Sequence, residues 1–151
     1  MTANSYELRR CIKEKDLNPI HHIREMVLFS AQLTRVKYNR HHPDDQNPNH
    51  HNFLFLKNNK PIGTTRLDFI RPNEAAVRLV AILPNYQNQG NGTAMLNALE
   101  SYAKEQGITK LVTNSATAAV KFYQAHGYVQ QKWDDPGEGS SQATIQMIKL
   151  I

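Results

Sequence analysis

The chain has very little cysteine and no long apolar stretch, and each shortage excludes a class of protein. Its 151 residues include one cysteine, Cys11, so it has no internal disulfide and no Cys-x-x-Cys motif. A single cysteine favours a reducing compartment, and we expect the cytoplasm. No apolar run approaches the roughly 20 residues that a membrane-spanning helix needs, so we expect no membrane partner. Residues 1–16 are polar and charged, which is not typical of a signal peptide.

Several ligand-binding motifs are also missing. The chain has neither the Gly-x-x-x-x-Gly-Lys of a P-loop nor a dinucleotide fingerprint near a first strand. The net charge of +5 suits an anionic partner. We find no helix-turn-helix and no aromatic RNA-binding signature, so a nucleic-acid partner is not expected. No Cys or Glu is spaced to complete a zinc site around the histidine pairs, and we expect no metal. These pairs are His21-His22, His41-His42 and His50-His51.

What is present indicates one globular domain over residues 1–151. A hydrophobic fraction of 40% is enough for a sizeable core. Asn18-Pro19 is typical of a helix start, with Asn as the N-cap and apolar spacing that continues to Leu33. The other expected strands and helices are strand Tyr6–Ile12, hairpin strands Phe53–Leu56 and Ile62–Ile70, strand Ala75–Leu83, helix Thr93–Gln106, strand Ile108–Thr113, a short helix Thr117–Ala125, strand Tyr128–Trp133 and strand Thr144–Leu150. This order predicts an α/β (α+β) fold with a mixed, mostly antiparallel twisted sheet flanked by helices.

The segment between strand Ala75–Leu83 and helix Thr93–Gln106 is the strongest functional signal. It reads Gln87-Asn88-Gln89-Gly90-Asn91-Gly92. The two glycines allow a close approach of the backbone, and the helix start presents unpaired N–H groups at the same place. A strand, a glycine loop and a helix N-terminus together predict a phosphate cradle, although a purely structural turn would have the same pattern.

A second motif about thirty residues later makes the pattern more specific. Val80-Ala81-Ile82-Leu83-Pro84 precedes the glycine loop, and Ala119-Val120-Lys121-Phe122-Tyr123-Gln124-Ala125-His126-Gly127-Tyr128 follows it. With both halves in this order, the sequence resembles the GNAT superfamily of acetyl-CoA-dependent N-acetyltransferases. The resemblance is strongest over residues 62–151.

The resemblance implies acetyl-CoA as co-substrate and a site for it. The coenzyme pyrophosphate would bind the main-chain N–H groups of Gln89 to Thr93, at the start of the helix. In the family two parallel strands splay apart and the pantetheine arm enters between them, here between Val77–Leu83 and Leu111–Asn114. Tyr123 stands at the family's position for the proton donor to the leaving thiolate; without the resemblance it would be interpreted as a core aromatic. The implied coenzyme-binding residues are Val80, Ala81, Ile82, Gln87, Asn88, Gln89, Gly90, Asn91, Gly92, Thr93, Asn114 and Tyr123.

The chain departs from the family pattern at two positions, which leaves the general base open. Ala76 stands where many relatives have Glu, and Thr144 where one branch has His. Glu74 is close to the first position, and the loop Asn39–Asn49 adds further candidates. The candidate bases are Asp44, Asp45 or a histidine. His41 and His42 in the loop, and His50 and His51 directly after it, would border the acceptor pocket.

The implied reaction is direct acetyl transfer to a primary amine. The acceptor, a small molecule or a peptide, is not identified by the sequence. A non-catalytic acyl-CoA-binding or sensor protein is the alternative, because the strand carboxylate is absent. The final strands are a candidate homodimer surface.

Overall fold

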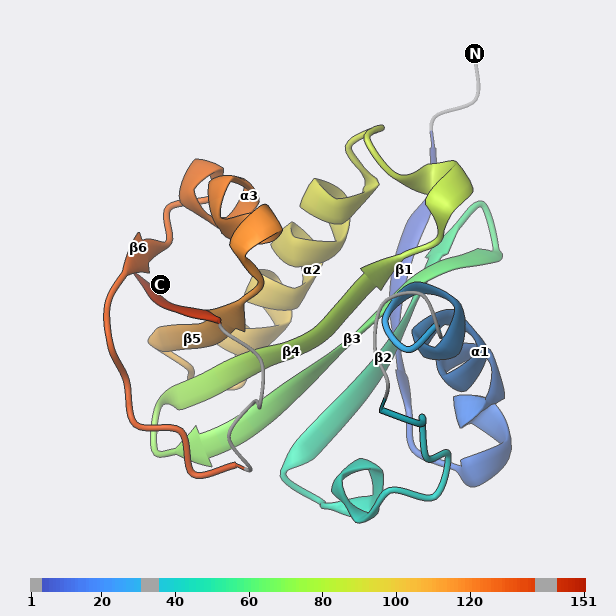
Figure 1. The fold of residues 1–151 in the computed structure, drawn as a ribbon, viewed down its shortest axis with the longest axis horizontal. Helices are drawn as coiled ribbons and strands as arrows, with labels where there is room; N and C mark the ends of the chain where they lie inside the picture. The colour runs from blue at the N-terminus through green and yellow to red at the C-terminus, as the bar shows by residue number, and fades with distance from the viewer. Residues whose placement is uncertain (1–3, 31–35, 138–143) are drawn as a thin grey trace.

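A seven-stranded sheet with helices on both faces forms the part of the protein that the structure describes (Figure 1). The computed structural model describes residues 4–30, 36–137 and 144–151. The strand order is β1-β2-β3-β4-β5-β7-β6, and every neighbouring pair is antiparallel except β4 and β5. The predicted α/β class with a mixed, mostly antiparallel sheet is therefore confirmed. The strands are β1 (Tyr6–Cys11), β2 (His50–Lys57), β3 (Lys60–Arg71), β4 (Glu74–Ile82), β5 (Lys110–Ser115), β6 (Val129–Gln130) and β7 (Ile145–Leu150).

The helices divide between the two faces of the sheet (Figure 1). Helix α1 (Asn18–Val27) packs on one face, where Ile20 and Ile23 meet Leu54 of β2. Helices α2 (Asn91–Glu105) and α3 (Val120–Ala125) pack on the other, where Leu99 and Tyr123 share a core with the β-strands. Side chains alternate along a strand, so β2 supplies apolar residues to both cores. The sheet is thus covered on both sides, and β4 lies at its centre.

The turn between β2 and β3 shows how local sequence sets the register. Asn58 and Asn59 both have positive φ, at 50° and 66°. A two-residue hairpin turn requires this left-handed pair, and Asn tolerates it better than most residues. The predicted hairpin is confirmed, with strands longer than predicted.

Two predicted elements, the first helix and the strand Tyr128–Trp133, had wrong boundaries. Helix α1 begins at Asn18 itself, because a 3-10 turn (Glu14–Leu17) runs directly into it, and Asn18 therefore does not cap the helix. The helix ends at Val27, and Leu33 lies outside the described residues. The strand predicted over Tyr128–Trp133 is reduced to the two residues of β6. Trp133 turns into the sheet instead, where its indole Nε1 donates to the carbonyl of Thr113.

No helix within the described residues is long and apolar enough to cross a membrane.

Candidate active site

The glycine loop leaves the start of α2 open. A 3-10 turn (Pro84–Tyr86) and four turn residues connect β4 to α2. Gly90 is the N-cap residue, with φ of 83°, and no side chain caps the helix. The N–H of Ala94 bonds to the carbonyl of Gly90 and so begins the helical pattern. The N–H groups ahead of Ala94 have no intrahelical carbonyl to bind, and together with the helix dipole they form a site suited to an anion.

Side chains of the loop brace it rather than extend from it. Asn91 is fully buried; its Nδ2 donates to the carbonyl of Tyr86 at 2.8 Å and its Oδ1 accepts from the hydroxyl of Tyr6 at 2.9 Å. Gln87 donates to the carbonyl of Ile82 at 2.8 Å, and Gln89 donates to the carbonyl of Asn85. Because both polar atoms of the Asn91 side chain are already hydrogen-bonded, Asn91 can offer a ligand only its main-chain N–H.

The parallel pair β4–β5 opens into a fork just below this loop. Pairing runs from Glu74 with Lys110 to Val77 with Thr113, and no later β4 residue pairs with β5. Beyond that point Leu79 has a positive φ of 51°, at an irregularity in the β3–β4 register. Positive φ is uncommon for a leucine and costs roughly 1–3 kcal/mol. The bulge bends β4 away from β5.

The segment after the bulge pairs with no described strand on its β5-facing edge. Ala81 pairs with Thr64 and Ile82 with Gly63, both on β3. Gly63 is required there, because a Cβ would lie 2.9 Å from the carbonyl oxygen of Ala81. The β5-facing edge of Val80, Ala81 and Ile82 therefore faces the fork, as the resemblance implied.

Side chains satisfy the backbone groups at the base of the fork. The hydroxyl of Thr113 donates to the carbonyl of Val77 at 2.9 Å, and the indole of Trp133 donates to the carbonyl of Thr113 at 3.1 Å. Buried carbonyls rarely remain unpaired. Where β4 and β5 separate, side-chain donors thus replace the main-chain hydrogen bonds between the strands.

Tyr123 lies in the core beside the fork. It is 5% exposed, and its ring meets those of Phe122 and Tyr128 edge-on, each at a centroid distance of 5.3 Å. Burial raises the pKa of the Tyr123 hydroxyl, and a hydrogen bond with Thr113 partly opposes this. The tyrosine is therefore protonated at neutral pH and is suited to donate a proton.

A charged network covers the opposite face of β3 and β4. Arg78 donates through Nε to Asp68 at 2.9 Å and makes a bidentate pair with Asp135, at 2.7 and 2.9 Å. Asn114 also donates to Asp135, at 2.8 Å. Arg66 binds Asp68 from the same face. Neither Arg78 nor Asp135 is among the site residues predicted from the sequence, although a lone arginine in an apolar strand indicates a buried acidic partner.

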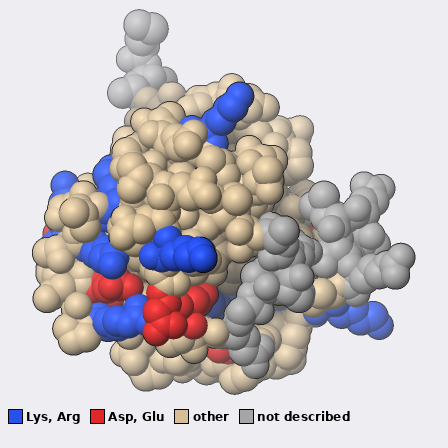
Figure 2. Space-filling view, turned by 60° about the vertical axis from the view of Figure 1, so that its left-hand side comes forward, with Lys and Arg blue, Asp and Glu red and all other residues tan. Residues whose placement is uncertain are grey.

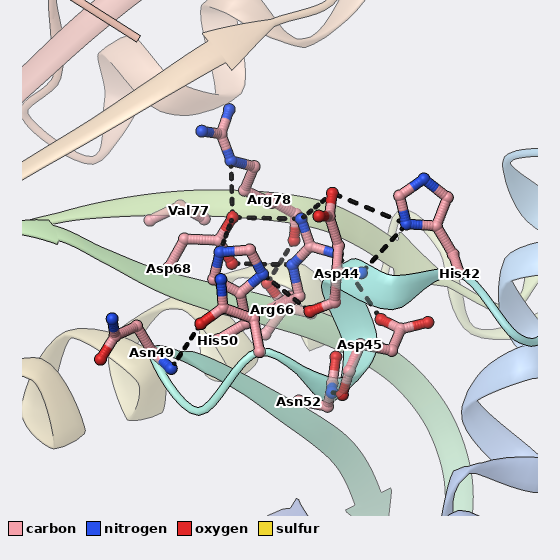
Figure 3. Close-up of polar contacts among 12 residues, drawn as sticks. His42, Asp44, Asp45, Asn49, His50, Asn52, Arg66, Asp68, Val77 and Arg78 are labelled. Atoms are coloured by element: carbon pink, nitrogen blue, oxygen red, sulfur yellow. Dashed lines mark hydrogen bonds and ion pairs between the residues drawn. The ribbon is translucent and has the colours of Figure 1, made fainter. Parts of the chain in front are cut away.

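The loop ahead of β2 joins this network (Figure 3). Asp45 is buried and pairs with Arg24 of α1 at 2.9 Å and with Arg66 at 3.5 Å. Asp44 is half-exposed and lies 3.9 Å from Arg66. Asp45 is therefore engaged within the protein, whereas Asp44 remains accessible. On the face shown in Figure 2, acidic side chains lie next to basic ones.

His50 and His51 are neighbours on β2 and point to opposite faces of the sheet, as the alternation of side chains along a strand requires. His50 lies 3.5 Å from Asp68, whereas His51 meets the hydroxyl of Tyr102 on the α2 face at 2.7 Å. His41 is exposed beside Glu14, and His42 accepts from the N–H of Asp44. Among the described residues no group of three His, Cys, Asp or Glu side chains is arranged to hold a metal.

The departing position on β4, Ala76, and the nearby Glu74 offer no free base. Ala76 is fully buried and carries no polar atom in its side chain. Glu74 pairs with Arg71 at 2.8 Å and with Lys110 at 3.6 Å, at the start of β4. The general base therefore stays unassigned.

Comparison with known proteins gives a consistent result. Two Bacillus subtilis (strain 168) proteins are similar in sequence. One, named as a candidate acetyltransferase, is 27% identical over 121 residues, which is 80% of this chain and 82% of the relative. The other, the uncharacterized N-acetyltransferase YjcF, is 26% identical over 115 residues, which is 76% of this chain and 79% of the relative.

Solved structures share the fold at low sequence identity. A GNAT-family acetyltransferase from Staphylococcus aureus Mu50 aligns with a TM-score of 0.78 and 14% identity, over 97% of this chain and 99% of that chain. The PaiA N-acetyltransferase from Thermoplasma acidophilum, in complex with coenzyme A, aligns with a TM-score of 0.74 and 18% identity, over 97% and 99%. The model of the acetyltransferase (GNAT) family matches residues 17–128, which contain both the glycine loop and the fork. The chain belongs to the acetyltransferase (GNAT) family, whose acetyl donor is acetyl-CoA.

Proposed function

We propose that this chain, as one N-acetyltransferase domain, transfers the acetyl group of acetyl-CoA directly to a primary amine. The observation that carries this proposal is the fork between β4 and β5, which opens beside the uncapped start of α2. An anionic head and an extended amide-bearing tail can then bind one continuous surface. Acetyl-CoA has that shape and charge.

The main chain of the glycine loop would bind the pyrophosphate. The N–H groups from Gln89 to Thr93 supply the donors, together with the left-handed turns at Asn88 (φ 59°) and Gly90 (φ 83°). The helix dipole adds favourable charge, typically worth 0.3–1 kcal/mol at an exposed site. The loop is braced by Asn91 before any ligand arrives, so little ordering free energy is lost on binding.

The pantetheine arm would lie along the free edge of β4. Ala81 and Ile82 pair with β3 on one side only, Val80 lies at the register irregularity before them, and none of the three pairs with β5. An arm with amide groups can add to the β5-facing side as a strand would. One of these N–H groups would polarise the thioester carbonyl. Asn114, across the fork on β5, would contribute a side-chain contact to the arm.

Transfer would proceed in a ternary complex. The neutral amine attacks the thioester carbon, a C–N bond forms and the C–S bond breaks. The thiolate takes the proton of the Tyr123 hydroxyl. The attacking nitrogen loses one proton to solvent, and the tyrosinate takes one proton back from solvent. Much of the acceleration would come from holding the two substrates together.

A non-catalytic acyl-CoA-binding protein is the second candidate, and one observation favours it. Ala76 supplies no carboxylate where many relatives have glutamate, and Glu74 is held in ion pairs. Such a protein would bind acetyl-CoA and release no thiol.

Two assays separate these functions. A thermal shift with acetyl-CoA tests binding, because a ligand of the native state raises the melting temperature. A free-thiol assay over small-molecule and peptide amines then tests transfer. No thermal shift refutes both functions, whereas a shift without thiol release from any amine favours the binding protein.

A further inference from the structure

Three side chains meet where the two strands of the fork begin to separate. The last parallel pair is Val77 with Thr113, so Arg78 and Asn114 are the first residues beyond it on β4 and β5. The carboxylate of Asp135 contacts both of them. Its Oδ1 and Oδ2 accept from Arg78 at 2.7 and 2.9 Å, and Oδ2 also accepts from Nδ2 of Asn114 at 2.8 Å. We call Arg78, Asn114 and Asp135 the fork clasp.

Further contacts hold the residues of the fork clasp in place. The N–H of Gly137 donates to Asp135 at 2.8 Å, and Asp68 accepts from Nε of Arg78 at 2.9 Å. The guanidinium of Arg78 lies 5.7 Å from the ring of Trp133, whose indole is bonded to Thr113. The side chains of Arg78 and Asp135 are only 17% and 10% exposed. A charge-assisted, mostly buried contact of this kind fixes geometry more strongly than a surface pair does.

The clasp also fixes the orientation of the Asn114 amide. A carboxylate only accepts hydrogen bonds, so the amide must turn its NH₂ group toward Asp135. Its carbonyl Oδ1 then points elsewhere as an acceptor. The pantetheine arm carries amide N–H groups, which are the donors that such an acceptor requires.

We propose that Asp135 is a positioning residue that sets the opening of the β4–β5 fork and turns the carbonyl of Asn114 toward the arm. This inference rests on the proposed function, because it assigns the fork to the acyl-pantetheine arm. The contacts described for Asp135 are with Arg78, Asn114 and Gly137, and none of them is with the glycine loop or Tyr123. Its effect is therefore confined to the tail of the coenzyme.

The test uses the coenzyme and its nucleotide half. Calorimetry of the full chain measures the affinity for acetyl-CoA and, separately, for adenosine 3′-phosphate 5′-diphosphate, which lacks the arm. Asp135→Asn keeps the shape and leaves Arg78 paired with Asp68, but its new NH₂ opposes that of Asn114. We expect acetyl-CoA affinity to fall about tenfold, with the nucleotide affinity unchanged within about twofold.

A neighbouring aspartate provides the matched control. Asp134 precedes Asp135 in the chain, but its side chain is 96% exposed and pairs only with Arg71 among the contacts described. Asp134→Asn is expected to change neither affinity. A double-mutant cycle with Asn114→Ala adds a second readout: Asp135→Asn should cost less in that background, because the amide that it orients is gone.

Each outcome decides the proposal. Acetyl-CoA affinity within twofold of wild type in Asp135→Asn overturns it, and so does a parallel loss of both affinities, which indicates general damage to the fold. If Asp135→Asn does not fold, Asp135→Glu, which keeps the charge and displaces the carboxylate by one methylene, must show the same split between the two ligands. Failure of the wild-type protein to bind either ligand refutes the proposed function instead.

Discussion

The ion pair between Arg24 and Asp45 allows a sharp test of whether Asp45 is structural. Both side chains are almost fully buried, at 1% and 3% exposed, and their closest atoms are 2.9 Å apart. Arg24 also donates to Tyr38 and to Asn52, which are uncharged, and its Nε has no partner among the described residues. Removing the Asp45 carboxylate therefore leaves a buried guanidinium without its closest counter-charge.

The expected cost of Asp45→Ala follows from that burial. Breaking a buried pair by removing one partner typically costs about 3–5 kcal/mol. A domain of this kind has a total stability of about 5–15 kcal/mol. With a urea slope of about 2 kcal/mol per molar, the unfolding midpoint should fall by about 2 M. Replacing both partners, as Arg24→Met with Asp45→Leu, should cost less, because no unpaired charge remains.

Urea unfolding followed by circular dichroism measures this, with an exposed pair as the control. Arg9 and Glu7 also lie 2.9 Å apart, but their side chains are 50% and 47% exposed. Glu7→Ala should leave the midpoint unchanged within error, since water screens such a pair. A midpoint for Asp45→Ala equal to that of Glu7→Ala would refute the reasoning from burial. If Asp45→Ala instead changed the KM for the acceptor and left stability unchanged, Asp45 would be assigned to the acceptor site.

Three further perturbations test the site. Gly92→Glu should abolish acetyl-CoA binding in calorimetry, because its carboxylate would repel the phosphates, whereas its Cβ would make only an ordinary contact, 3.4 Å from the ring of Phe122; unchanged affinity in a folded variant contradicts the phosphate cradle. Tyr123→Phe should lower turnover by roughly a hundredfold with little change in coenzyme affinity, since general acids contribute at least that much; full turnover would remove Tyr123 from the mechanism. Asp135→Asn should lose about 2 kcal/mol of stability at pH 7, because the pKa of Asp135 is lowered from 3.8 to about 2 in the folded protein. The contact with Arg78 lowers this pKa most, and the hydrogen bonds from Gly137 and Asn114 lower it further. A lowered pKa stabilises the folded state above pH 4, so the difference from wild type should vanish as the pH falls from about 4 to about 2, and a constant difference in urea titrations would contradict this.

The sequence predicted those parts of the fold that local rules determine. The hairpin follows from Asn58-Asn59, which adopt the left-handed turn, and the α2 start follows from Gly90, which leaves the helix uncapped. Both depend on residues adjacent in the chain. The crossover from β4 through α2 to β5 follows from the lengths of its segments, since a parallel pair needs such a connection.

The rest depends on contacts between distant residues. Arg78 and Asp135 are 57 positions apart, and the pattern around Arg78 shows only a charge in an apolar strand. Trp133 leaves the predicted strand because Thr113, 20 positions earlier, needs a donor for its carbonyl. Asp45 resembled a loop residue open to substrate, yet its partner Arg24 lies 21 positions away on α1. No local periodicity encodes these pairings.

The proton balance of the reaction follows from how these charges are paired. A general base needs a lone pair that is free to accept a proton, but the two carboxylates that contact Arg78, those of Asp68 and Asp135, already accept from its guanidinium. The low pKa of Asp135 makes it a weaker base than an unpaired carboxylate. Burial has the opposite effect on Tyr123, whose raised pKa keeps its hydroxyl protonated, as the proposed role of proton donor requires. The proposed mechanism therefore has an acid at the leaving group and no protein base at the nucleophile, so turnover should rise with pH as the acceptor amine loses its own proton to water.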